Sequence, residues 1–107
     1  MKIAIAGPYS APTEIERKNN LNFLNSVAAK LVKMGHIPVI GIHTALPIVV
    51  EAGELNNYEL IMAISMTAIE SCDALLIVAE SKGALLEKEQ FIQMGKPVFH
   101  TISEIPI

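Results

Sequence analysis

Residues 3–8 read Ile-Ala-Ile-Ala-Gly-Pro, a short apolar run that stops at a glycine and a proline. A continuous apolar run of this length, rather than an alternating one, is typical of a strand buried on both faces of a parallel sheet. Three further apolar segments predict strands at residues 37–42, 74–79 and 97–102. The first strand therefore sits in a set of four, which is where the fold prediction begins.

Helical patterns separate these strands. The Thr13-Glu14-Ile15-Glu16 sequence predicts the capped start of a helix that ends at Gly35, with Leu21, Leu24, Ala28, Leu31 and Val32 on one apolar stripe. Residues 58–71 and 83–94 predict two more helices, while residues 43–56 are expected to be irregular or to hold a short helix. This alternation predicts an α/β fold: a single Rossmann-like or flavodoxin-like domain over residues 1–107. We expect a four- or five-stranded parallel sheet in the order 2-1-3-4 with helices on both faces.

The amino-acid composition argues against several classes of function. The 107 residues are 51% hydrophobic and 18% charged, with a formal net charge of −3 and no cluster of Lys and Arg, so nucleic-acid binding is not expected. The lone Cys72 excludes an internal disulfide and favours a reducing, cytoplasmic location. The sequence opens without a signal-peptide pattern, and no apolar stretch has the roughly 20 residues of a membrane span. No metal-ligand spacing is present, so no metal and no cofactor are predicted.

The helix expected at residues 58–71 is apolar nearly all round. Its apolar residues are Leu60, Ile61, Met62, Ala63, Ile64, Met66, Ala68 and Ile69. At about 3.6 residues per turn they cannot share one face, so the sheet cannot cover all of them. The sequence therefore predicts a homo-oligomer, at least a dimer, with this helix at the subunit interface.

Candidate binding residues follow the strands, because ligands of parallel sheets bind outside the carboxyl ends of the strands. The first loop is Gly7-Pro8-Tyr9-Ser10, where the glycine leaves the backbone open and the next helix offers free N–H groups. The loop lacks the glycine-rich patterns of dinucleotide and triphosphate sites, and an ordinary strand-to-helix turn explains it equally well. His43, after the second strand, is either a ligand contact or a polar surface residue.

The loop after the third strand holds Ser81-Lys82-Gly83, followed by Glu87 about one turn into a helix. Ser81 is a natural N-cap, and Gly83 leaves the backbone accessible to a ligand. Glu87 has two interpretations from spacing alone. It is a first-turn acid that stabilises the helix dipole, or it is a catalytic carboxylate.

Taken together, several segments resemble the nucleoside 2-deoxyribosyltransferase-like superfamily over nearly the whole chain. They are Met1–Ser10, Gly35–Pro38, Cys72–Ala74, the Ser81-x-Gly83-x-x-x-Glu87 element and Gly95–Val98. That superfamily includes base-exchanging transferases and deoxynucleoside 5′-monophosphate N-glycosidases. The resemblance implies a nucleoside or nucleotide substrate and Glu87 as the nucleophile that cleaves or exchanges an N-glycosidic bond. It also implies that Ser81 and Gly83 hold the sugar or its 5′-phosphate, and that Gly7 is the first-loop glycine.

The chain departs from that superfamily at a second acid, eight residues before Asp73, where it has Ser65. A hydroxyl cannot replace a carboxylic acid in proton transfer, which contributes roughly 10²- to 10⁴-fold in rate. The hydrolases' first-loop arginine is missing too. Asp73 is predicted about 20 Å from the site, at the wrong end of its strand.

Three sources could supply another acid: Glu80, Glu51 or Glu54, and a neighbouring subunit. The alternative function is a nucleoside-binding or assembly protein of the same fold that has lost turnover. A response-regulator-like module is disfavoured, because no acidic cluster follows the first strand.

Overall fold

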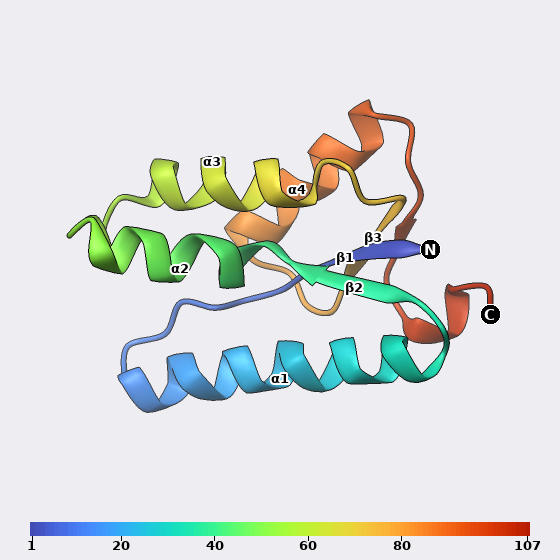
Figure 1. Ribbon diagram of the computed structural model, residues 1–107, viewed down its shortest axis with the longest axis horizontal. Helices are drawn as coiled ribbons and strands as arrows, with labels where there is room; N and C mark the ends of the chain where they lie inside the picture. Colours follow the sequence, from blue (N-terminus) through green and yellow to red (C-terminus); the bar gives the residue numbers. More distant parts are fainter.

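The computed structural model describes residues 1–107 and is built on one all-parallel sheet (Figure 1). Its strands are β1 (Lys2–Ala6), β2 (Ile37–Ile40), β3 (Ala74–Ile77) and β4 (Val98–Phe99), in the order β2-β1-β3-β4. The predicted α/β class and strand order are confirmed, with four strands rather than five. The strands end earlier than predicted, and β4 has only two residues before a 3₁₀ helix at Ile102–Glu104.

Four helices cover the sheet: α1 (Glu14–Lys33), α2 (Gly41–Glu51), α3 (Tyr58–Ile69) and α4 (Lys82–Gln93). Helix α1 packs on one face of the sheet and α3 and α4 on the other, as predicted. Helix α2 leaves the end of β2 directly and packs chiefly along α3 (Figure 1). The α2–α3 pair therefore extends past the carboxyl ends of the strands, which is where it can wall a binding site.

Alternation along β1 divides the core into two halves. Ile3 and Ile5 pack with α1, whereas Ala4 and Ala6 pack with α3 and α4. Both sets are buried, so the run quoted from the sequence is a central strand with two covered faces. The larger buried partners on the two sides are Leu24, Leu31 and Leu76 with α1, and Ile69, Leu75 and Phe91 with the other helices.

The sequence leaves residues 43–56 as irregular or holding a short helix, and the structure bears out the helix: α2 occupies residues 41–51, and the loop to α3 follows it. Pro47 lies inside this helix. Burial outweighs the proline, since Ala45 and Val49 are fully buried. Gly41 has a packing role: a Cβ there would lie 2.7 Å from the backbone oxygen of Ser65, so only glycine lets α2 cross α3 this closely.

The position of α2 also bears on the expected subunit interface on α3. Helix α2 covers much of the side of α3 that was expected to face another subunit, and Met62, Ser65 and Ile69 are buried within the chain.

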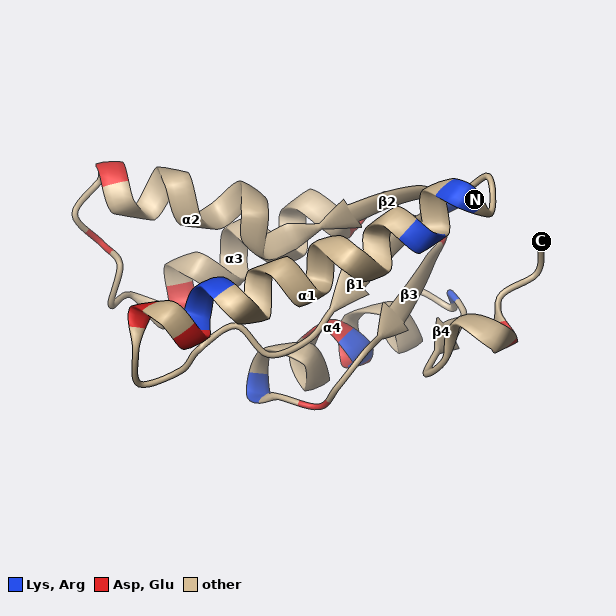
Figure 2. Ribbon diagram, turned by 90° about the horizontal axis from the view of Figure 1, so that it is seen from below, with Lys and Arg blue, Asp and Glu red and all other residues tan.

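On α1, Val27 is buried and Val32 is exposed, so the predicted apolar stripe is displaced at its end. No helix has both the length and the apolar character needed to cross a lipid bilayer. Lys and Arg are spread over separate elements rather than gathered in a stripe (Figure 2).

Candidate functional site

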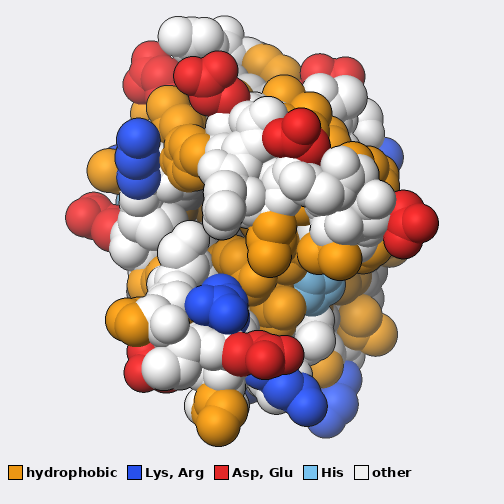
Figure 3. Space-filling model, turned by 90° about the vertical axis from the view of Figure 1, so that its left-hand side faces the viewer, with side chains coloured by type: hydrophobic (Ala, Val, Ile, Leu, Met, Phe, Trp, Pro, Cys, Tyr) orange, Lys and Arg blue, Asp and Glu red, His pale blue; other side chains and the backbone are white.

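A cavity of about 460 Å³ lies beyond the carboxyl ends of β1 and β3. The loop after β1, the α2–α3 pair and the first turns of α4 form its walls. Its lining residues are Gly7, Pro8, Tyr9, Ser10, Ala11, Arg17, Ile42, Leu55, Asn56, Tyr58, Ile61, Met62, Ser65, Ser81, Lys82, Gly83, Ala84 and Glu87. Figure 3 looks onto this end of the molecule, where apolar side chains gather in the middle of the face and charged ones surround them. The cavity volume of about 460 Å³ is in the range of cavities that bind small molecules.

Glu87 lines this cavity and is only 8% exposed. Its Oε2 atom is buried and has no hydrogen-bond partner. Burial raises the pKa of the carboxyl group from 4.5 to about 7. Helix α4 begins at Lys82, so Glu87 is in the second turn and not in the first. The helix-dipole interpretation therefore loses its basis, because that effect fades beyond the first turn.

Ser65 of α3 reaches the same cavity from the opposite wall. It is 1% exposed, and its Oγ atom has no hydrogen-bond partner. Buried polar atoms without partners are uncommon in folded proteins, and each one costs free energy. Glu87 Oε2 and Ser65 Oγ are two such atoms, and both belong to residues that line this one cavity.

All four residues of the first loop line the cavity, as predicted. The Asn20 side chain on α1 donates a hydrogen bond to the Tyr9 carbonyl oxygen at 2.9 Å and holds the loop in place. Close packing also explains why residue 7 is a glycine, which the sequence alone does not show. A Cβ there would lie 2.6 Å from a methyl group of Val78 and 3.0 Å from one of Leu24.

Ser81 and Gly83 bring the first turn of α4 to the cavity. The Ser81 hydroxyl accepts a hydrogen bond from the Ala84 N–H at 3.0 Å, which confirms the predicted N-cap. Gly83 faces α3: a Cβ would lie 3.1 Å from the Met62 sulfur and 3.7 Å from the Tyr58 hydroxyl oxygen. Its small size therefore serves contact between the helices as well as access for a ligand.

His43 does not line the cavity. Because α2 starts at Gly41, residue 43 is turned towards α1, where its Nε2 atom lies 2.5 Å from Asn25 Oδ1. Burial lowers the pKa of the imidazole. The structure thus supports a packing role for His43, while the neighbouring Ile42 reaches the cavity.

Four polar residues of the cavity lining are not among the predicted site residues: Arg17, Asn56, Tyr58 and Lys82. Arg17 follows the N-cap of α1 by one turn and donates a hydrogen bond to the Ala11 carbonyl oxygen at 2.9 Å. The Lys82 ammonium lies 4.7 Å from the centroid of the Tyr58 ring. A signal for Tyr58 was available, because it precedes Ser65 by seven residues, or two helical turns.

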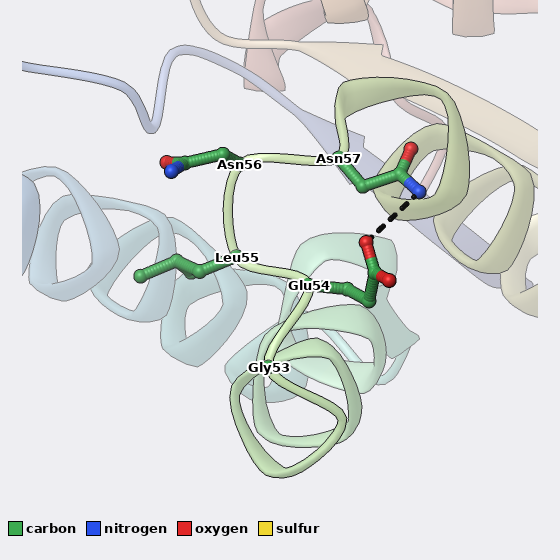
Figure 4. Close-up of a pocket in the computed structure, with 5 residues that line it drawn as sticks. All are labelled: Gly53, Glu54, Leu55, Asn56 and Asn57. Carbon is green, nitrogen blue, oxygen red and sulfur yellow. Dashed lines mark hydrogen bonds between the residues drawn. The ribbon is translucent and has the colours of Figure 1, made fainter.

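The acids proposed as substitutes do not reach this site. Glu87 is the only acidic residue in the lining, and neither Glu80 nor Glu51 contributes. Glu54 belongs to a separate, open concavity on the loop between α2 and α3. There it accepts a hydrogen bond from the Asn57 side chain at 3.3 Å (Figure 4). No group of three or more His, Cys, Asp or Glu side chains is placed to hold a metal ion.

No curated protein and no solved structure matches this chain. One family model matches residues 1–100, which is nearly the whole chain and contains every element of the cavity. The chain therefore belongs to the family described as Domain of unknown function (DUF4406).

Proposed function

We propose that the cavity binds a nucleoside or nucleotide and that the protein cleaves or exchanges its N-glycosidic bond, with Glu87 as the nucleophile. The observation that carries the proposal is the buried Glu87 carboxyl group, whose Oε2 atom has no hydrogen-bond partner, in the lining of a cavity of ligand size. A buried acid with a perturbed pKa in a cavity is typical of a functional site. The superfamily resemblance of the Ser81–Glu87 element supports the same residue.

The chemistry has two steps. A carboxylate oxygen of Glu87 bonds to the anomeric carbon as the base leaves with the electron pair of the broken C–N bond. Water or a second base then takes the sugar from the glycosyl ester and restores the carboxylate. With a pKa near 7, both protonation states of Glu87 are populated at neutral pH, and the nucleophilic one increases as the pH rises.

The cavity lining is suited to both parts of such a ligand. Ile42, Ile61 and Met62 offer apolar surface for a base. Arg17, Lys82 and the N–H groups at the start of α4 favour an anionic group such as a phosphate. If the protein acts faster on a 5′-monophosphate than on the matching nucleoside, these groups bind the phosphate. Arg17→Gln should then reduce the difference between the two rates.

The test is a panel of deoxynucleosides and their 5′-monophosphates, with and without an acceptor base, followed by detection of free or exchanged base. The wild-type protein is expected to release or exchange the base of at least one compound in the panel. Glu87→Gln should lower turnover on the order of 10³-fold or more, since the nucleophile is removed. An equally active Glu87→Gln variant would exclude Glu87 as the nucleophile.

A second candidate, ligand binding without turnover, has its own observation. Ser65 stands where the resembled superfamily has an acid, and the cavity holds no second carboxylate. In this case panel members would raise the melting temperature of the protein but release no base. If panel members stabilise the protein but none of them loses its base, ligand binding without catalysis is the favoured function.

Assembly into a homo-oligomer in the cytoplasm remains part of the proposal, with a different surface from the one first expected. The exposed apolar residues on α2 and α4 are Ile48, Val50, Leu85, Leu86 and Ile92. Light scattering that gives a mass near the 11.6 kDa of one chain would contradict assembly. A multimer that Ile48→Glu dissociates, while Glu51→Lys leaves it intact, would place the interface on α2.

A further inference from the structure

A departing base needs a proton or a strong hydrogen bond, and the cavity offers no second carboxylic acid to supply it. Ser65 is 1% exposed and sits deep in the wall. Tyrosine is the strongest acid among the remaining neutral donors, since its ordinary pKa is about 10. The chain has two tyrosines, Tyr9 and Tyr58, and both line the cavity.

The start of α3 fixes the position of Tyr58. The Asn57 side chain accepts a hydrogen bond from the Leu60 N–H at 3.0 Å, so the helix begins at Tyr58 itself. Met62 and Ser65 follow at spacings of four and seven residues, which places all three on one face of α3. All three line the cavity with Glu87.

Two contacts relate the Tyr58 ring to α4. Its hydroxyl oxygen lies 3.7 Å from the position that a Cβ of Gly83 would take. The Lys82 ammonium lies over the ring, 4.7 Å from its centroid. The hydroxyl thus faces the helix that carries the nucleophile, one turn before Glu87.

We propose that Tyr58 donates the proton to the departing base, in place of a carboxylic acid. This inference rests on the proposed function of the cavity. As the bond between the anomeric carbon and the base nitrogen breaks, the base takes the electron pair and then the Tyr58 hydroxyl proton, which leaves a phenolate. Water then attacks the anomeric carbon, the ester bond to Glu87 breaks, and the water's proton returns to the phenolate oxygen.

The charges around Tyr58 change in the direction that this transfer requires. Burial and the charge of Glu87 raise the pKa of the Tyr58 hydroxyl, so the proton is in place before reaction. When the Glu87 carboxylate bonds to the sugar, its negative charge disappears, and with it one of the two causes of the raised pKa. The Lys82 ammonium over the ring stabilises the phenolate.

The experiment compares Tyr58→Phe with wild type on nucleosides, or their monophosphates, whose leaving bases have graded acidity. The series ends with an N7-methylated purine, whose positively charged base departs as a neutral molecule and needs no proton. We expect Tyr58→Phe to lose about 10²- to 10⁴-fold in kcat/KM on unmodified bases. On the N7-methylated substrate the loss should be less than about fivefold, because proton donation is not needed there. A merely structural role would lower both rates equally.

Tyr9→Phe is the matched variant, since it also removes one phenolic hydroxyl from the cavity. It should lower the rates on the two substrate types by the same factor. Equal losses for both substrate types in Tyr58→Phe, or leaving-base dependence in Tyr9→Phe instead, would overturn the assignment while the proposed function stands. Wild-type protein that releases no base even from the N7-methylated substrate would overturn both.

Discussion

Buried polar groups at the two ends of the sheet differ in whether they have hydrogen-bond partners. At the amino-terminal end, His36 is 8% exposed and both ring nitrogens have partners. Its Nδ1 accepts from the Met1 amino group at 2.9 Å, and its Nε2 donates to the Pro106 carbonyl oxygen at 2.8 Å. An ammonium only donates and a carbonyl only accepts, so these two partners fix the tautomer. His36 thus joins the two ends of the chain.

At the carboxyl-terminal end, Glu87 is equally buried, yet Glu87 Oε2 and Ser65 Oγ have no partners. A third unpartnered atom, Gln90 Oε1, lies outside the cavity lining, on a side chain that donates to the Met66 carbonyl oxygen. Two of the three unpartnered atoms therefore belong to the cavity lining, whereas both ring nitrogens of His36 are paired at the other end of the sheet. That contrast predicts opposite effects of mutation on stability at the two ends.

The largest expected effect concerns Glu87 and pH. Its folded-state pKa of about 7 exceeds the ordinary 4.5, so the folded protein holds more protons than the unfolded one between these values. The free energy of unfolding should therefore fall as the pH rises from about 4.5 to above 7, by up to about 3 kcal/mol. Glu87→Gln should abolish this fall. Denaturant titrations at pH 5 and pH 9 measure it.

Glu89→Gln is the matched control for this prediction. Glu89 is exposed on the same helix, two residues further along, so its substitution should leave the pH dependence unchanged. A wild-type protein that is equally stable at pH 5 and pH 9 would contradict the buried, partnerless state of Glu87.

His36→Ala tests the other end and should destabilise the protein by about 2–3 kcal/mol, because it removes two hydrogen bonds and leaves a cavity. The cavity near Glu87 lies at the opposite end of the sheet, so ligand binding by the folded variant should not change. Thermal unfolding and ligand titration check both points. Loss of binding in a fully folded His36→Ala variant would show that the two ends are coupled.

Much of the fold could be predicted because local patterns agreed with the tertiary structure. The run at Ile3–Ala6 is buried on both faces, and the caps at Thr13 and Ser81 form as expected. The sequence leaves the choice between irregular structure and a short helix open at residues 43–56, because it does not show the tertiary contact that decides it. Gly41 is needed for the close crossing of α2 and α3, and α2 continues through Pro47.

The candidate site was predictable in part, because the strand ends place their loops together: eight of the 18 lining residues are among the predicted site residues. Gly7, Ser81 and Glu87 follow β1 and β3, which are neighbours in the sheet. Tyr58 and Arg17 could not be found this way, since each reaches the cavity from a helix that the strand-end rule does not consider. His43 was misplaced because the helix begins directly at the strand end.

Asp73→Ala should have a smaller effect than His36→Ala. Asp73 is exposed and accepts one hydrogen bond, from the Lys2 N–H at 2.8 Å, at the amino-terminal end of β3. Its loss should lower the free energy of unfolding by about 1 kcal/mol, since water replaces the carboxylate as acceptor. Denaturant titration measures the change. Asp73→Asn keeps an acceptor at the same position and should recover most of the loss.

Ser65→Ala should have the smallest effect and the opposite sign. The Ser65 hydroxyl is 1% exposed and unpartnered, so the folded protein bears the cost of removing it from water without a compensating bond. Its removal should raise the free energy of unfolding by about 1 kcal/mol or less. The same change should weaken ligand binding, since the hydroxyl is then unable to bond to the ligand. Denaturant titration without ligand and calorimetric titration with it measure the two effects. A variant that is less stable than wild type would mean that Ser65 holds the fold, as His36 and Asp73 do at the other end.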